Sequence, residues 1–142
     1  MVKSQINSKS IKQLENDYSK EPTEFPTGLV ENCYKYRKIP VKDLTIEQLR
    51  LLISQQIGTK YLIGVALEKL GRNILAEGDF YEGDLLVAVS GLPIDFWTEN
   101  QTEFQSFKNL VERNSELIKT ELGEKKFDRI NDKIKASAQH RL

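Results

Sequence analysis

Residues 45–70 read TIEQLRLLISQQIGTKYLIGVALEKL, and this stretch decides the predicted fold. Thr45 and Gln48 stand at the first and fourth positions of a capping box, which predicts that a helix starts there. Apolar residues then follow at helical spacing: Ile46, Leu49, Leu52, Ile53 and Ile57. Gly58 is placed to end this helix in a left-handed turn. Residues 61–70 are nearly all apolar, which predicts a second, central and largely buried helix.

Helical spacing recurs on both sides of this stretch, and no segment alternates apolar and polar residues as a half-buried strand does. Further helices are expected at residues 10–18, 29–37, 85–89 and 98–120, and after Gly123. The last helix should turn Phe127, Ile130, Ile134 and Ala138 inward and carry the ion pairs Lys125–Asp128 and Arg129–Asp132 on its outer face. We therefore predict an all-α protein without a sheet, with a disordered tail at residues 1–9 and a single compact domain of about 6–8 helices at residues 10–142.

The composition limits the classes of protein to which this chain can belong. Charged residues make up 30% of the chain, and no apolar run approaches the roughly 20 residues that a membrane span needs. The first ten residues lack the apolar centre of a signal peptide, and a single cysteine, Cys33, permits no internal disulfide, so a cytoplasmic protein is expected. The one histidine, His140, stands near the C-terminus. One cysteine and one terminal histidine do not provide a thiolate–imidazole pair or a zinc site, so no catalytic residue, metal or cofactor is predicted.

Residues 73–107 concentrate the negative charge. They read NILAEGDFYEGDLLVAVSGLPIDFWTENQTEFQSF and contain seven carboxylates, no lysine or arginine, and six of the twelve aromatic residues. The segments on either side have net charges of +4 and +3. A neutral chain that gathers its carboxylates in one block attracts a basic partner and repels nucleic acid. The simpler alternative is a solvated acidic loop whose aromatic residues belong to the core.

The repeated Glu-Gly-Asp of residues 77–84 admits several interpretations. Four carboxylates in EGDFYEGD can bind a hard cation, although their spacing is not that of an EF-hand loop. Alternatively, Gly78 and Gly83 provide turns while Asp79 and Asp84 cap the helices that follow, which we favour. A third interpretation is a small hydrolase that uses two of these carboxylates for acid–base catalysis, which requires a cleft and separated pKa values. A further alternative is that the protein is a helical adaptor that docks another helix through the face of residues 101–120.

Nucleic-acid binding is considered for residues 34–38, where tyrosines alternate with basic residues. The neutral net charge and the acidic centre oppose binding to a polyanion. We therefore predict a surface that binds a protein, with no nucleic acid and no membrane as partner. Its candidate residues are Glu77, Asp79, Tyr81, Glu82, Asp84, Asp95, Trp97, Glu99 and Glu103. For Tyr81 and Trp97 a place in the core is an equal alternative, and for Phe96, Phe104 and Phe107 it is favoured.

Four segments together resemble one family. They are SIKQLENDY at residues 10–18, LTIEQLRLLISQQIG at 44–58, LAEGDFYEGDLL at 75–86 and DFW at 95–97. In their order and spacing they resemble the helical immunity proteins of bacterial contact-dependent growth inhibition (CDI). Thr59 and Gly64 depart from the family's pattern, which concerns only the entry to the helix at 61–70.

The resemblance implies a cytoplasmic, non-catalytic protein that neutralises the C-terminal toxin domain of a CDI system by binding it tightly. One branch of the family is paired with RNase A-like toxins whose active site is covered, so the implied partner is a basic ribonuclease in a 1:1 complex. A ribonuclease groove must be basic to hold phosphates, and a carboxylate-rich surface competes by imitating that charge. Among the candidates, Glu99 and Glu103 lie outside the four segments and are expected to be the more toxin-specific contacts.

Overall fold

The computed structural model describes residues 7–139, and the predicted all-α class is confirmed within that range. Residues 10–139 form nine α-helices and one short 3-10 helix, and the described residues contain no strand, only an isolated bridge between Ser10 and Pro40. The bounds are α2 Ile11–Leu14, α3 Gly28–Tyr36, α4 Ile46–Ser54, α5 Thr59–Arg72, α6 Asp84–Ser90, α7 Ile94–Glu99, α8 Gln101–Arg113, α9 Ser115–Leu122 and α10 Glu124–Gln139, with the 3-10 helix at Val41–Asp43.

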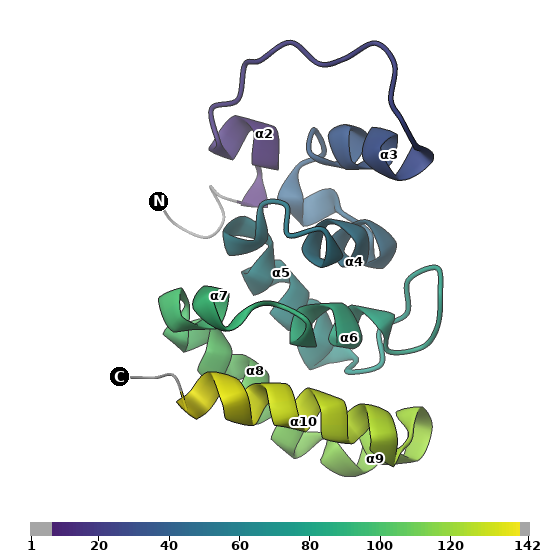
Figure 1. Cartoon of the computed structure of the whole chain (residues 1–142), viewed down its shortest axis with the longest axis vertical. Helices are drawn as coiled ribbons and strands as arrows, with labels where there is room; N and C mark the ends of the chain where they lie inside the picture. The colour runs from purple at the N-terminus through teal and green to yellow at the C-terminus, as the bar shows by residue number, and fades with distance from the viewer. Residues whose placement is uncertain (1–6, 140–142) are drawn as a thin grey trace.

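The two helices of the opening stretch form the centre of the molecule. Helix α5 contacts α4, α6 and α8, and α4 packs across α6 (Figure 1). Helix α10 lies on the opposite side from α3 and covers α6, α7 and α9. The apolar stripe of α4 is buried at Leu49, Leu52 and Ile53. These side chains join one continuous apolar core that extends from Ile11 to Ile134, which stabilises the arrangement because apolar burial contributes about 25 cal/mol per Å².

Both predicted capping boxes are present. The Ser10 and Thr45 hydroxyls each accept a hydrogen bond from the backbone N–H three residues on, and the Gln13 and Gln48 side chains accept from the cap residues in return. The predicted ends are less accurate. Helix α4 ends at Ser54, and Gln56 at φ 56° is the first left-handed residue after it, whereas Gly58, also left-handed at φ 62°, is the N-cap of α5. The prediction that Gly58 ends the first helix is therefore wrong, whereas its predicted left-handed backbone is confirmed.

Two further boundaries differ from the predictions for local reasons. Helix α2 stops at Leu14 because Asn16 is left-handed, which leaves Tyr18 86% exposed instead of facing inward. The predicted helix at 98–120 is two helices. At their junction the Asn114 side-chain amide donates to the Leu110 carbonyl at 2.8 Å, and such local side-chain bonding competes with the helical backbone.

Two predictions concern the ends of the chain, and the structure describes these ends only in part. His140 lies outside them, as do residues 1–6 of the predicted disordered tail. The remainder of that tail includes Lys9, whose carbonyl accepts a hydrogen bond from the Val41 N–H at 2.9 Å.

Candidate functional site

Asp84 holds together the loop before α6, which we call the acidic loop (residues 77–82). Its carboxylate accepts hydrogen bonds from the N–H groups of Gly78 at 2.6 Å, Phe80 at 3.1 Å and Tyr81 at 3.4 Å. Asp84 is only 3% exposed. The residue predicted to cap α6 therefore closes the preceding loop instead, and the N-cap of α6 is Gly83. A charged acceptor that satisfies three amides fixes the loop's shape.

Helix α4 fastens the same loop from the other side. The Glu47 carboxylate accepts from the Asp79 N–H at 2.9 Å and from the Arg50 guanidinium at 2.7 and 2.6 Å. Arg50 Nε also lies 4.0 Å from the Asp84 carboxylate. Hydrogen bonds from Arg50 lower the pKa of Glu47, and the same pairing raises the pKa of Arg50. These residues bring the 44–58 and 75–86 segments together as one folded unit.

The two glycines of the Glu-Gly-Asp repeat are required by this arrangement. A Cβ on Gly78 would lie 2.5 Å from a Glu47 carboxylate oxygen. Gly83 has a φ of 88°, and a Cβ there would lie 2.8 Å from the Leu122 side chain. The repeat is therefore explained by close packing and a left-handed backbone. No three His, Cys, Asp or Glu side chains within residues 7–139 are grouped so as to hold a metal ion.

The Glu47–Arg50 pair predicts a dependence of stability on pH. Because the folded-state pKa of Glu47 lies below its ordinary value of 4.5, its contribution is present above pH 4.5 and lost as the pH falls through the lowered pKa. We expect Glu47→Gln to reduce the free energy of unfolding at pH 7 by about 1–2 kcal/mol and to flatten its decrease below pH 4.5. Urea unfolding from pH 3 to 7 measures this. Glu116→Gln, at a side chain that is 89% exposed, is the control, and equal pH profiles for both variants would contradict the prediction.

The acidic loop presents two aromatic side chains to solvent. Phe80 is 69% exposed and lies under the Arg50 guanidinium at 4.4 Å, while Tyr81 is 38% exposed and lies 3.9 Å from Lys126 Nζ, both distances measured to the ring centroid. Glu77, Asp79 and Glu82 around them are exposed. Phe80 was not among the predicted contacts, although its place between two glycine turns, outside any helical stripe, was a signal for exposure. Held aromatic rings among carboxylates are suited to anchor a protein partner.

The remaining exposed carboxylates form a second group. Asp95 and Glu99 lie one turn apart on α7 and are exposed, and Glu103, in the first turn of α8, is partly exposed. Figure 1 shows the acidic loop and α7 at opposite sides of the molecule, with α6 between them. The block at 73–107 is therefore two separate acidic groups in space.

Asp84 and Trp97, both predicted contacts, are in the interior. The Trp97 ring stacks on Phe107 with centroids 5.4 Å apart and the planes 9° apart, and it touches Phe96 and Phe104 at centroid distances of 5.1 and 5.7 Å. Trp97 is 3% exposed. Of the two interpretations left open by the sequence, Trp97 has its place in the core and Tyr81 faces solvent. Phe104 and Phe107 are buried as favoured, and Phe96 is half-buried.

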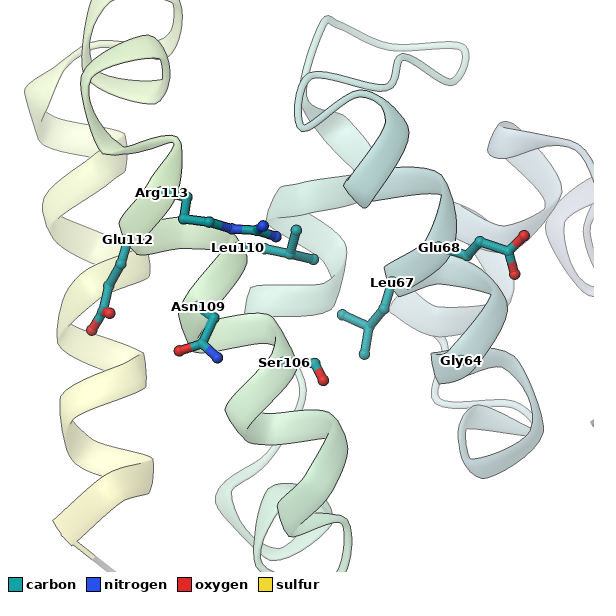
Figure 2. Close-up of a pocket in the computed structure, with 8 residues that line it drawn as sticks. All are labelled: Gly64, Leu67, Glu68, Ser106, Asn109, Leu110, Glu112 and Arg113. Carbon is teal, nitrogen blue, oxygen red and sulfur yellow. The ribbon is translucent and has the colours of Figure 1, made fainter.

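The structure bears on the hydrolase alternative. Three of its four candidate carboxylates are exposed, and the fourth, Asp84, already accepts three backbone hydrogen bonds. A cavity of about 580 Å³ does lie between α5 and α8 (Figure 2). Its carboxylates, Glu68 and Glu112, extend away from each other in that view. Neither place brings together a pair of carboxylates suited to acid–base catalysis of glycoside hydrolysis.

The adaptor alternative requires a free apolar face on α8 and α9. Phe104, Phe107, Leu110, Val111 and Ile118 are buried in the core. Helix α8 packs against α5 and α7. The predicted docking face is thus already occupied by the protein's own helices, and only Leu117 on it is substantially exposed, at 44%. No helix within residues 7–139 is long and apolar enough to cross a membrane.

The comparisons with known proteins identify one family that this chain matches. A family model described as CDI immunity proteins matches residues 13–107, about two thirds of the chain. The match covers α3 to α7, including α4, the acidic loop and α6, and it ends within α8. Searches of curated proteins and of solved structures found no match.

Proposed function

The chain belongs to the family of CDI immunity proteins, and we propose that it neutralises its toxin by binding the toxin domain through the acidic loop. The observation that carries this proposal is the pair of exposed aromatic rings, Phe80 and Tyr81, held among three exposed carboxylates by the buried Asp84. A contact surface that is already ordered in the free protein loses little conformational entropy on binding.

The toxin is proposed to be a basic ribonuclease, bound one to one, whose active site the acidic loop covers. Glu77, Asp79 and Glu82 supply negative charge in the place of substrate phosphates, and Tyr81 supplies an aromatic contact. Such a protein acts without catalysis of its own and works in the cytoplasm, where the toxin meets RNA. The charge separation along the chain supports this proposal, since a nuclease groove must attract a polyanion.

Asp95, Glu99 and Glu103 have a different proposed part. They lie away from the acidic loop, so one small toxin domain that covers the loop does not need to touch them. Their charge still speeds encounter with a basic partner through the long-range field. Glu99 and Glu103 lie outside the four segments that resemble the family, although the family model matches through residue 107.

Charge reversal distinguishes the two acidic groups. We expect Glu99→Lys with Glu103→Lys to slow association and to weaken its salt dependence, leaving dissociation and thermal stability nearly unchanged. We expect Glu77→Lys with Glu82→Lys, an equal change of charge, to speed dissociation as well and to raise Kd by about 100-fold or more, because these side chains meet the toxin directly. Surface plasmon resonance at several salt concentrations measures both. Faster dissociation for the 99/103 pair alone would move the contact to α7 and α8.

The function itself is tested by co-expression with the toxin domain encoded immediately upstream. Rescue of growth and co-purification of a 1:1 complex are expected. Failure of both would remove the proposal. A ribonuclease assay on the purified toxin, with and without this protein, then tests the proposed toxin class.

A further inference from the structure

A second concave surface lies beside the acidic loop, between α6 and α10. This groove has a volume of about 490 Å³. Tyr81, Val87 and Ile130 line it with apolar surface, and Gly91 lines it at the end of α6. Tyr81 thus belongs both to the acidic loop and to the groove, so the two surfaces are continuous.

The rim of the groove is positively charged. Lys126, Arg129 and Lys133 follow one another at helical spacing on α10, with Asp132 as the one carboxylate among the lining residues. In the part of the chain that the structure describes, the predicted ion pairs Lys125–Asp128 and Arg129–Asp132 are not formed. Within residues 7–139, neither Arg129 nor Lys133 lies within 4 Å of a carboxylate. Lys126 is directed over the Tyr81 ring. Unpaired cations beside apolar surface are available to a partner that supplies carboxylates.

The groove also has a place in the chain that suits specific recognition. Helix α6 lies inside the residues that match the family, whereas α10 lies wholly beyond residue 107. One wall is therefore built from the shared scaffold, and the cationic wall comes from a part of the chain that the family model does not match. Residues that differ between members are suited to discriminating one partner from another.

We propose that the groove between α6 and α10 receives a carboxylate-bearing, partly apolar segment of the same toxin domain whose basic active site meets the acidic loop. This inference rests on the proposed function and names the second half of the interface. The toxin is then held by charges of both signs, with Tyr81 at the boundary between them. An interface of two signs fixes the orientation of the partner, since a rotated toxin would place like charges together.

Nucleic acid is a poorer occupant for this groove. Its phosphates would meet the cations of α10, but they would also lie beside Glu77, Asp79 and Glu82 of the adjoining loop. Phosphates that lose water in the groove would also face apolar side chains, which cannot replace the lost hydrogen bonds.

The test exploits opposite expected signs. Arg129→Glu with Lys133→Glu makes this protein more acidic by four charges, and so does the control Lys125→Glu with Lys135→Glu, at exposed positions on α10 that do not line the groove. If a basic toxin responds only to the overall charge of this protein, it associates faster with both variants than with the wild type. The proposal predicts that the groove variant alone binds more weakly, with Kd raised at least 10-fold and dissociation faster, while the control binds as well as the wild type or better.

The measurements are kinetics with the full chain and the toxin domain encoded upstream, together with thermal unfolding to confirm that both variants fold. A Kd for the groove variant equal to that of the control, with the wild-type complex intact, would overturn the groove but leave the proposed function standing. Absence of a wild-type complex would instead remove the proposed function. If the groove variant changes self-association of the free protein and not toxin binding, the groove is a contact between copies and the inference is overturned.

Discussion

Replacing Asp84 with alanine is expected to lower the free energy of unfolding by about 2–4 kcal/mol and to abolish tight toxin binding, although Asp84 is only 3% exposed in the free protein. The variant deprives the N–H groups of Gly78, Phe80 and Tyr81 of their acceptor, and each amide must find water in a partly buried site. It also leaves Arg50 with Glu47 as its remaining close partner. The loop that carries the proposed contacts then loses its fixed shape and must be ordered again on binding.

Urea unfolding and toxin titration of the same variant separate these two effects. For stability alone the matched control is Asp79→Ala on the same loop, whose side chain is exposed and whose change should stay within about 0.5 kcal/mol of wild-type stability. Asp84→Asn keeps the size and one acceptor oxygen, so a smaller loss is expected. If Asp84→Ala keeps full stability and still loses toxin binding, Asp84 is a direct contact, and the buried position is opened by the toxin.

The helices were accessible to sequence reasoning because their signals are local. The capping boxes at Ser10 and Thr45 and the apolar spacing of α4 and α10 need no knowledge of the rest of the chain. Boundaries set by single left-handed residues, such as Asn16 and Gln56, carry no comparable signal, since neither is glycine. The number of helices was underestimated because α7, Ile94–Glu99, was not predicted and because the junction at Asn114 depends on a side-chain hydrogen bond that propensity does not reveal.

The sequence predicted which stretch of the chain carries the carboxylates of the candidate site, but it did not predict how they are arranged on the surface. Counting carboxylates along residues 73–107 cannot show that α6 separates them into two groups. Nor can it show that Asp84 faces inward to backbone amides while Asp79, five residues earlier, faces solvent. That distinction arises from α4, because Glu47 and Arg50 reach the loop only in the folded chain. The sequence did not predict the cationic groove for the same reason, because its two walls, α6 and α10, are distant in sequence.

The second large effect is expected at Trp97, the one tryptophan of the chain. Trp97→Ala should lower the free energy of unfolding by about 3–5 kcal/mol, because it removes a buried ring that contacts Phe96, Phe104 and Phe107 and leaves a cavity under α7. Trp97→Phe keeps part of the stacked contact and should lose about 1–2 kcal/mol. Urea unfolding followed by circular dichroism measures both, since the fluorescent residue itself is removed.

Toxin affinity then decides between a core residue and an interface anchor. A core role predicts that Trp97→Phe, still folded, binds the toxin as tightly as the wild type. An anchor predicts a loss of at least 2 kcal/mol, about 30-fold in Kd, with little change in stability. Wild-type fluorescence gives an independent check against a toxin variant without tryptophan: a ring that is 3% exposed is already shielded from water, so its emission should barely move on binding. A large blue shift would mean that Trp97 is uncovered in the free protein and that the packing of α7 on α8 is looser than its stacked rings imply.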